Sequence, residues 1–323
     1  MDSPTISDVL DARRIISPYI SRTPLRRYPA LSDLIGADVW IKHENYQVLG
    51  AFKVRGGVNL VGRGSADERR RGYVSASTGN HGQSVAFAAR TFGASCTIVV
   101  PENPNPVKIK AMESLGAKVV RHGTVFEEAL EYAVAMAEST SARFVHPANE
   151  PLLIAGVATY SLEIFEEVGD IDYLVVPLGA GSGAAGACIV KDAASPRTKV
   201  IAVQSAHAPA GYESWKQGKI VSAGMKTIAE GIATSRGYDL PQQILRGRLH
   251  DFVLVDDAWI LEAIYRYVEC ARTLVETAGA ASLAAALNMK DRLRGKRVVL
   301  VASGGNISPS QLRVAMDTAP SEA

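Results

Sequence analysis

The sequence predicts an α/β fold with mostly parallel sheets, and three observations support this prediction. Short runs rich in Val and Ile alternate with longer runs of helical periodicity over nearly the whole chain. The short apolar runs are bounded by Gly, Pro or Asp, which is typical of strands buried on both faces. No internal repeat or low-complexity linker interrupts the alternation. Strands that alternate with helices in this way are typical of α/β domains.

Nine short apolar runs are the expected strands. They cover residues 39–42, 73–76, 96–100, 118–121, 144–146, 173–177, 199–203, 252–255 and 297–302. Seven runs with helical periodicity cover residues 79–92, 107–115, 126–138, 153–168, 183–192, 258–275 and 280–293. About nine strands can form one wide sheet or two smaller ones, and the residues alone favour neither. The segment 204–249 is the least regular, and such a stretch in an α/β fold is often a loop near the site.

Length, composition and charge exclude several classes of protein. The 323 residues suffice for one large or two medium domains, and 47% hydrophobic with 21% charged residues is an ordinary globular mixture. The net charge is +2 and the Lys and Arg are scattered, so neither nucleic acid nor a membrane is an expected partner. Asp2 and Asp8 lie in an N-terminus without an apolar core, so no signal peptide is expected, and no apolar run approaches the roughly 20 residues that span a bilayer.

The cysteines and several histidines receive no chemical role. Cys96, Cys188 and Cys270 lie far apart without a C-x-x-C pair, so they predict neither a disulfide framework nor a zinc site. A reducing, cytoplasmic location follows from this usage. His43, His122 and His250 are interpreted as surface or strand-end side chains.

A glycine-rich turn, 179–186, follows the expected strand 173–177 and opens a helical run. The backbone N–H groups of such a turn, together with the helix dipole, form an anion site. Residues 181–186 also satisfy G-x-G-x-x-G, but a dinucleotide fold needs an acid at the end of the next strand, where Gln204 stands. A lone phosphate therefore fits better than a dinucleotide. Glycines that only allow tight strand–helix packing are the alternative.

Small polar residues crowd a second turn, after the expected strand 73–76. Ser77, Thr78, Gly79, Asn80 and His81 are consecutive and open an apolar helix. A helix N-cap needs only one such residue. The cluster therefore favours a site that binds a carboxylate over a simple cap.

A third turn and one lysine complete the candidate chemistry. Ser303 follows the last expected strand, at the strand end where open α/β sheets bind ligands, although a plain turn is an equal alternative. Lys53 is flanked by Phe52 and Val54. An apolar setting lowers the pKa of a lysine and makes its amine a usable nucleophile, although most lysines lie on the surface.

Read together, these segments resemble the fold-type II pyridoxal-phosphate enzymes, in the branch of threonine and serine dehydratases and serine racemase. The resemblance runs over nearly the whole chain and in the expected order. The matching segments are Arg22-Thr23-Pro24-Leu25, Phe52-Lys53-Val54-Arg55-Gly56, Ser77-Thr78-Gly79-Asn80-His81-Gly82-Gln83, Gly179-Ala180-Gly181-Ser182, Val275-Glu276-Thr277-Ala278-Gly279-Ala280 and Ser303-Gly304-Gly305-Asn306.

The resemblance implies roles for these residues. Lys53 is the implied Schiff-base lysine and general base, and Thr78 stands where serine racemase has its opposite-face acid/base. The implied cofactor-binding residues are Phe52, Lys53, Asn80, Gly179, Ala180, Gly181, Ser182, Gly183, Glu276 and Ser303. Within this set Asn80 faces the 3′-oxygen and Ser303 the pyridine nitrogen of pyridoxal 5′-phosphate. The substrate carboxylate is implied to lie on Ser77, Thr78, Gly79 and His81.

The resemblance also implies the architecture. It predicts a fold like that of the tryptophan synthase beta subunit, with two open, mostly parallel sheets flanked by helices and the cofactor in the interdomain cleft. A large domain of residues 1–71 and 148–323 is expected to carry an inserted small domain, 72–147. A homodimer or higher homo-oligomer is expected.

The implied function is a pyridoxal-phosphate-dependent ammonia-lyase. Its expected substrate is a small β-hydroxy amino acid of the L-threonine or L-serine type, or 3-hydroxyaspartate, and its products are a 2-oxo acid and ammonia. A serine or amino-acid racemase is the alternative; a NAD-dependent dehydrogenase and a non-catalytic ligand-binding protein are weaker ones. Arg236 is a candidate for a second substrate carboxylate. Metal-binding members place acids just after the strand 199–203, and none stands there, so no magnesium or calcium is expected.

Overall fold

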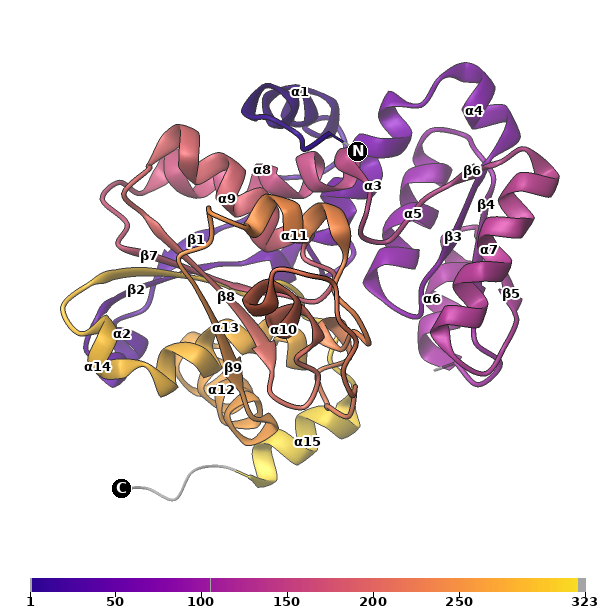
Figure 1. Ribbon diagram of the computed structural model, residues 1–323. Coiled ribbons are helices and arrows are strands. Elements are labelled where there is room, and N and C mark those ends of the chain that lie inside the picture. Colours follow the sequence, from indigo (N-terminus) through magenta and orange to yellow (C-terminus); the bar gives the residue numbers. More distant parts are fainter. Residues whose placement is uncertain (1, 105, 319–323) are drawn as a thin grey trace. The chain divides into compact units, whose positions relative to one another are not determined.

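The computed structural model describes residues 2–104 and 106–318, and it confirms an α/β fold with two separate, parallel-rich sheets (Figure 1). The chain forms two compact units. The first unit is built from residues up to 21 and from 53–159, and the second from 22–52 and from 160 onward. Among the described residues, no helix combines the length and the apolar character needed to cross a membrane.

The first unit contains a four-stranded, all-parallel sheet in the order β5-β4-β3-β6. Its strands are β3 (Tyr73–Ala76), β4 (Cys96–Val100), β5 (Lys118–Arg121) and β6 (Arg143–Phe144). Its helices are α1 (Ile6–Ile16), α3 (Lys53–Arg63), α4 (Ala66–Arg71), α5 (Asn80–Thr91), α6 (Pro106–Ser114), α7 (Phe126–Thr140) and the first part of α8 (Pro151–Glu167). Ala129, Ala133 and Ala137, spaced by four, place one face of α7 on the sheet, and α5 lies on the opposite face (Figure 1).

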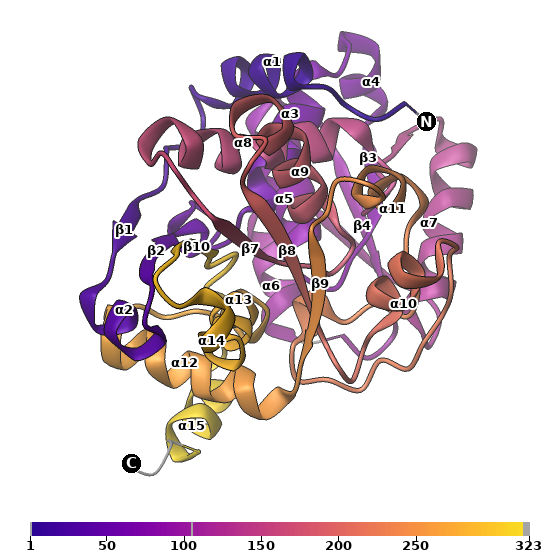
Figure 2. The ribbon, with the colours of Figure 1, turned by 60° about the vertical axis from the view of Figure 1, so that its left-hand side comes forward.

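The second unit contains a six-stranded sheet in the order β1-β2-β10-β7-β8-β9. Only β1 is antiparallel to its neighbour. The strands are β1 (Leu25–Arg27), β2 (Asp38–Lys42), β7 (Tyr173–Pro177), β8 (Lys199–Ser205), β9 (Asp251–Val255) and β10 (Arg297–Val301). Figure 2 shows β10, β7, β8 and β9 side by side.

Helices flank this second sheet and bury its core. They are α2 (Pro29–Ile35), η1 (Glu44–Tyr46), α9 (Ser182–Ala194), α10 (Ala210–Gln217), η2 (Glu230–Ile232), α11 (Asp239–Leu245), α12 (Asp257–Ala271), α13 (Thr277–Asn288), α14 (Lys290–Leu293) and α15 (Pro309–Asp317). The Ala- and Leu-rich helix α13 is almost wholly buried and packs on the sheet together with α12. Figure 1 shows α9 on the other side of the sheet.

All nine expected strands are present, with ends within two residues of the prediction. The prediction missed β1, a three-residue strand whose Arg26 and Arg27 are exposed. The expected helix 258–275 is wrong at its end, because Arg272 adopts a left-handed conformation (φ 54°) that stops α12. Helix α3 was also missed, because Gly56 and Gly57 lower its intrinsic helix propensity.

The first unit contains the segment 72–147 that the resemblance predicted as a small domain, but it is larger. It also takes in α1, α3, α4 and the first part of α8, because α3 packs against α5 and α1 against α3. The predicted boundaries at 72 and 147 stay a prediction.

Candidate active site

The strand order of the second unit marks a place for a ligand. From β7 the chain continues to β8 on one side, while β10 lies beside β7 on the other. The register of β7 and β10, in which Leu300 pairs with Val175, brings the carboxyl ends of both strands together. Open α/β sheets bind ligands at such a switch point. The glycine-rich turn follows β7 and Ser303 follows β10, so the structure brings these two predicted site segments to one sheet edge.

The glycine-rich turn offers unused hydrogen-bond donors. Helix α9 begins at Ser182, and Gly181 before it has a φ of 101°. Within the described part of the chain, the backbone N–H groups of Gly179, Ala180, Gly181 and Gly183 donate no hydrogen bond. They stand at the positive end of the α9 dipole, so the turn is suited to an anion.

The glycines of this turn are also required by packing. A Cβ on Gly179 would lie 2.5 Å from the carbonyl oxygen of Gly231, and one on Gly183 would lie 2.9 Å from the ring of Phe52. Packing against Gly231 and Phe52 therefore also requires these glycines, and it leaves the N–H groups of Gly179, Ala180, Gly181 and Gly183 available. The two interpretations describe the same turn.

The Ser303 turn holds the segment that precedes Lys53. The N–H of Phe52 donates to the carbonyl of Ser303 (3.1 Å), and Ala51 forms an antiparallel bridge with Gly304. The Ser303 hydroxyl has no hydrogen-bond partner among residues 2–104 and 106–318, although only 5% of this residue is exposed. It is therefore available to a ligand.

Glu276 lies against the same turn. Its N–H donates to the carbonyl of Gly304 (2.9 Å), and a Cβ on Gly304 would lie 2.4 Å from the Glu276 carboxylate. A Cβ on Gly279 would lie 2.3 Å from the Gly304 carbonyl oxygen. These contacts place Glu276 beside Ser303 in the second unit.

In the first unit, Lys53 lies close to the beginning of α5. Its carbonyl accepts a hydrogen bond from Ser84 Oγ (2.6 Å), and Gly57 allows this approach because a Cβ there would lie 2.3 Å from Ser84 Oγ. Burial lowers the pKa of Lys53 to about 8. The amine is therefore unlike that of a surface lysine, and a usable fraction of it is neutral near pH 7.

The polar turn after β3 is held by its own side chains. Ser77 is buried, and its hydroxyl oxygen accepts from the N–H groups of Gly79 (3.2 Å) and Gly82 (2.9 Å). Thr78 is exposed, and its hydroxyl has no hydrogen-bond partner in the described segments. Asn80 is the first residue of α5. The predicted residues 77–81 thus form one turn at a strand end, like the turns of the second unit.

His81 is buried and neutral. The Ser75 hydroxyl donates to the carbonyl of Val145 (2.7 Å), so its oxygen accepts from His81 Nε2 (3.1 Å), which fixes the tautomer. Burial, together with the nearby charge of Lys53, lowers the pKa of His81 to about 3. The imidazole therefore brings no positive charge to a carboxylate.

The irregular segment contains no acid cluster. Gln204 is fully buried; its side-chain oxygen accepts from the Tyr212 N–H (3.1 Å), and its Nε2 lies 3.3 Å from Thr234 Oγ1. Arg236 is exposed. No group of three or more His, Cys, Asp or Glu side chains among the described residues is arranged to hold a metal ion. That no divalent cation binds stays a prediction.

Sequence reasoning gave no role to three buried polar residues near these turns: Lys42, Tyr160 and Glu163. Tyr160 Oη donates to the carbonyl of Gly183 (3.0 Å), and Lys42 pairs with Glu163 (2.5 Å). One feature of the sequence could have pointed to them. The segment Arg22-Thr23-Pro24-Leu25 matches the family but was given no role, and in the structure it contacts Lys42.

Comparison with known proteins places the chain in a family. Residues 16–304 match the model described as pyridoxal-phosphate dependent enzyme, and the chain belongs to this family. It is 39% identical to the L-threonine ammonia-lyase of Thermotoga maritima over 95% of this chain and 77% of that protein. It is 34% identical to the L-threo-3-hydroxyaspartate ammonia-lyase of Saccharomyces cerevisiae over 94% of each. The structure of maize serine racemase is similar with a TM-score of 0.92 and 30% identity, covering 98% of both chains.

The predicted fold type, the enzyme class and the cofactor are thereby confirmed, and the dinucleotide alternative is set aside. The residues present fit pyridoxal 5′-phosphate. Taken by itself, the second unit has a turn suited to an anion and an unpartnered Ser303 hydroxyl. Taken by itself, the first unit has the Lys53 amine of lowered pKa.

Proposed function

We propose that this protein is an ammonia-lyase that removes water and ammonia from a small β-hydroxy amino acid and releases a 2-oxo acid. The observation that carries the proposal is the half-buried setting of Lys53, whose desolvation lowers its pKa to about 8 at the position where the resemblance requires a reactive amine. Membership of the pyridoxal-phosphate family and the names of two ammonia-lyase relatives support it.

The cofactor-binding roles follow the chemistry of each turn. The N–H groups of Gly179, Ala180, Gly181, Ser182 and Gly183 would hold the phosphate, the Ser303 hydroxyl the pyridine nitrogen and Asn80 the 3′-oxygen. Phe52 packs on Gly183 and borders this site, as Glu276 does through Gly304. Lys53 Nζ would hold the aldehyde carbon. When bound, the cofactor supplies the electron sink for the negative charge that develops at the substrate Cα.

The remaining steps belong to side chains of the first unit. The Lys53 amine would take the proton from the substrate Cα as general base. The substrate carboxylate would be bound at the start of α5 by Ser77, Thr78, Gly79 and His81, whose positive character comes from the helix N-terminus, since the His81 imidazole is neutral. This binding aligns the Cα–H bond with Lys53.

Ser303 favours elimination over competing reactions. A hydroxyl beside the pyridine nitrogen does not force its protonation, whereas a carboxylate would. The bound cofactor would then withdraw less negative charge from the substrate Cα, and Ser303 would thereby favour prompt loss of the β-hydroxyl over transamination. Replacing Ser303 by Asp should therefore slow the release of 2-oxo acid, and unchanged turnover would count against this argument.

The decisive experiment replaces Lys53 by Ala in the holoenzyme. We expect the absorbance band of the bound cofactor and the formation of 2-oxo acid from serine, threonine and 3-hydroxyaspartate to disappear. Lys219→Ala, at an exposed lysine, is the matched control and should retain both. A Lys53→Ala protein with the band and full activity would refute the assignment.

A racemase is the second candidate, and the exposed, unpartnered hydroxyl of Thr78 favours it, because an acid on the opposite face from Lys53 could return a proton to Cα. The similarity to maize serine racemase supports this alternative. Incubation with L-serine separates the two: an ammonia-lyase accumulates pyruvate, whereas a racemase accumulates D-serine.

We also propose the finer properties that the resemblance implies. These are a homodimer or higher homo-oligomer and a cytoplasmic location, the latter supported by three free cysteines of which two are buried. Light scattering of the purified holoenzyme tests the first, and a monomer would contradict it. A keto-acid assay over a panel of β-hydroxy amino acids identifies the substrate.

A further inference from the structure

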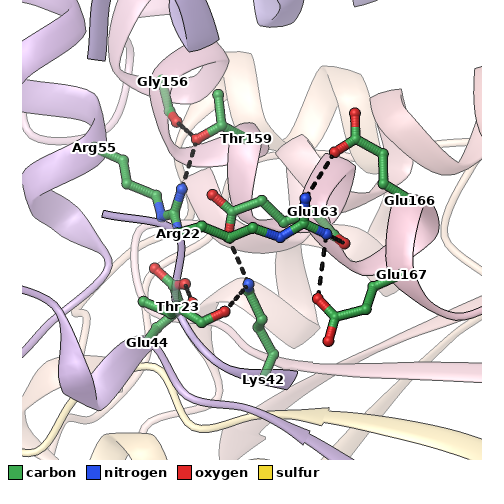
Figure 3. A network of polar contacts seen from close by, with 10 residues as sticks. All are labelled: Arg22, Thr23, Lys42, Glu44, Arg55, Gly156, Thr159, Glu163, Glu166 and Glu167. Carbon is green, nitrogen blue, oxygen red and sulfur yellow. Dashed lines mark hydrogen bonds and ion pairs between the residues drawn. The ribbon is translucent and has the colours of Figure 1, made fainter. Parts of the chain in front are cut away.

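The segment that leads to Lys53, residues 43–52, begins in a network of buried charges at the end of β2 (Figure 3). Lys42 has no exposed surface, and its ammonium donates to Glu163 Oε2 (2.5 Å) and to the carbonyl of Thr23 (2.8 Å). Glu44 is also fully buried, and its carboxylate accepts from the Thr23 hydroxyl (2.5 Å). Figure 3 shows Lys42 pointing between Thr23 and Glu163.

The matched segment 22–25 is what encloses this network. The carbonyl of Pro24 accepts from the N–H of His43 (2.9 Å), and Leu25 pairs with Lys42 between β1 and β2. Arg22 donates to the carbonyl of Glu163 (2.7 Å) and forms ion pairs with Glu166 and Glu167. Each residue from 42 to 44 is therefore fixed by a bond to residue 23 or 24.

The same helix that pairs with Lys42 also touches the glycine-rich turn. Tyr160 and Glu163 are spaced by three on α8 and therefore lie on one face of the helix. Tyr160 donates to the carbonyl of Gly183 (3.0 Å), and its ring packs edge-on against Phe52, with centroids 6.2 Å apart. One helical face thus contacts Lys42, which precedes segment 43–52, then Phe52 at the end of that segment, and the turn proposed to hold the cofactor phosphate.

We propose that Lys42, Glu163 and Tyr160 are positioning residues that hold segment 43–52, which leads to Lys53, against the glycine-rich turn of the second unit. A buried ion pair contributes little net stability, because desolvation of both charges offsets their attraction, but it tolerates only one geometry. A misplacement of about 1 Å between a reactive group and a bound cofactor costs about 100-fold in rate. The inference rests on the proposed roles of Lys53 and of residues 179–183.

The test separates positioning from stability. In the holoenzyme, the double variant Lys42→Met/Glu163→Leu replaces the pair by apolar side chains of similar volume, a change that is often neutral for folding. We expect kcat to fall by about ten-fold or more with KM changed less than about three-fold, and the visible circular dichroism of the bound cofactor to change. A folded double variant with unchanged kcat and unchanged dichroism would overturn the proposal.

Two further variants keep the result unambiguous. Tyr160→Phe removes only the hydroxyl bonded to Gly183 and should weaken cofactor retention by about ten-fold; retention and kcat equal to those of the wild type would also overturn the proposal.

Asp38→Asn is the control variant. It breaks the ion pairs with Arg27 (2.5 Å) and Arg297 (2.8 Å) at the opposite end of β2 and should change neither kcat nor dichroism. If the wild type forms no 2-oxo acid, the proposed function fails, while the dichroism still reports positioning.

Discussion

The two units place comparable turns at the ends of parallel strands, yet the turns are held in different ways. In the first unit, the side chain of Ser77 accepts two N–H groups of its own turn, and His81 is bonded to Ser75. In the second unit, the turn at 179–183 is held by the close approach of its glycines to neighbouring backbone and rings. The backbone N–H groups of Gly179, Ala180, Gly181 and Gly183 donate to no described residue.

This difference suits the two turns to different ligands. A turn held by packing offers donors whose strength does not change with pH, which suits a phosphate that stays bound through many reaction cycles. A turn held by side chains, with an exposed Thr78 at its tip, suits a substrate that must enter and leave. It also makes the first turn sensitive to the protonation of a buried histidine.

The largest expected effect is a loss of stability in acid. Burial lowers the pKa of His81 to about 3 and that of His43, in the second unit, to about 4, from an ordinary 6.5. The unfolded chain binds these protons first, so stability is complete above about pH 6.5 and falls as the pH drops toward 4 and below. Proton uptake by each histidine in the unfolded chain should lower the free energy of unfolding by on the order of 3 kcal/mol at the acidic end of this range. Urea unfolding at a series of pH values measures it.

Substitution of His81 isolates the contribution of the first unit's turn to this pH dependence of stability. His81→Gln keeps a donor for Ser75 and should make unfolding less dependent on pH between 6.5 and 4, whereas His122→Gln, at an exposed histidine, should leave the dependence as in the wild type. An identical slope for His81→Gln and the wild type would show that this imidazole is protonated in the folded protein.

The second effect concerns the glycine-held turn. Gly181→Ala places a Cβ 2.6 Å from Cβ of Pro241 at a φ of 101°, so the turn must shift, at a cost of about 1–3 kcal/mol, and cofactor affinity should fall. Gly218→Ala is the matched control, since it has a positive φ (69°) and no neighbour within 4 Å. Both variants are compared by thermal unfolding and by cofactor titration. Equal cofactor affinities would mean that the contact with Pro241 does not shape the turn.

The strands and their turns were predictable because both depend on local pattern. Apolar runs define the strands, and parallel strands end at one edge, so Gly179, Ser303 and Ser77 follow from their positions alone. Helix α3 was not predictable, because Gly56 and Gly57 serve contacts to other helices: a Cβ on Gly56 would lie 2.9 Å from the carbonyl of Leu153. Tertiary packing there overrides propensity.

The electrostatics of the site was predicted least well. His43 does follow a strand, as expected, but it is fully buried, with Nε2 bonded to the Tyr28 hydroxyl (2.9 Å) and Nδ1 to Asn45 (3.2 Å). Lys42 beside it is buried as well. Sequence patterns report which residues are apolar, but the burial of a charge depends on partners far along the chain, such as Glu163.

A smaller effect tests whether Ser303 acts chemically. Because its hydroxyl has no partner in the described chain, Ser303→Ala should leave the melting temperature unchanged and lower turnover by about ten-fold through loss of one hydrogen bond to the cofactor. Ser282 is the contrasting buried serine, since its hydroxyl donates to the carbonyl of Val301 (2.9 Å). Ser282→Ala should lower stability by about 1 kcal/mol and leave turnover unchanged. If the two variants behave alike, Ser303 is structural.

The smallest effect is expected at Thr78. Its side chain is exposed and bonded to no described residue, so Thr78→Ala should change the free energy of unfolding by less than about 0.5 kcal/mol. The formation of 2-oxo acid should fall only a few-fold, because backbone donors at the start of α5 still hold the carboxylate. Any D-serine formed from L-serine should disappear, since its formation needs an acid opposite Lys53. A variant that still interconverts the enantiomers at the wild-type rate would remove Thr78 from the mechanism and leave the side-chain-held turn with a binding role only.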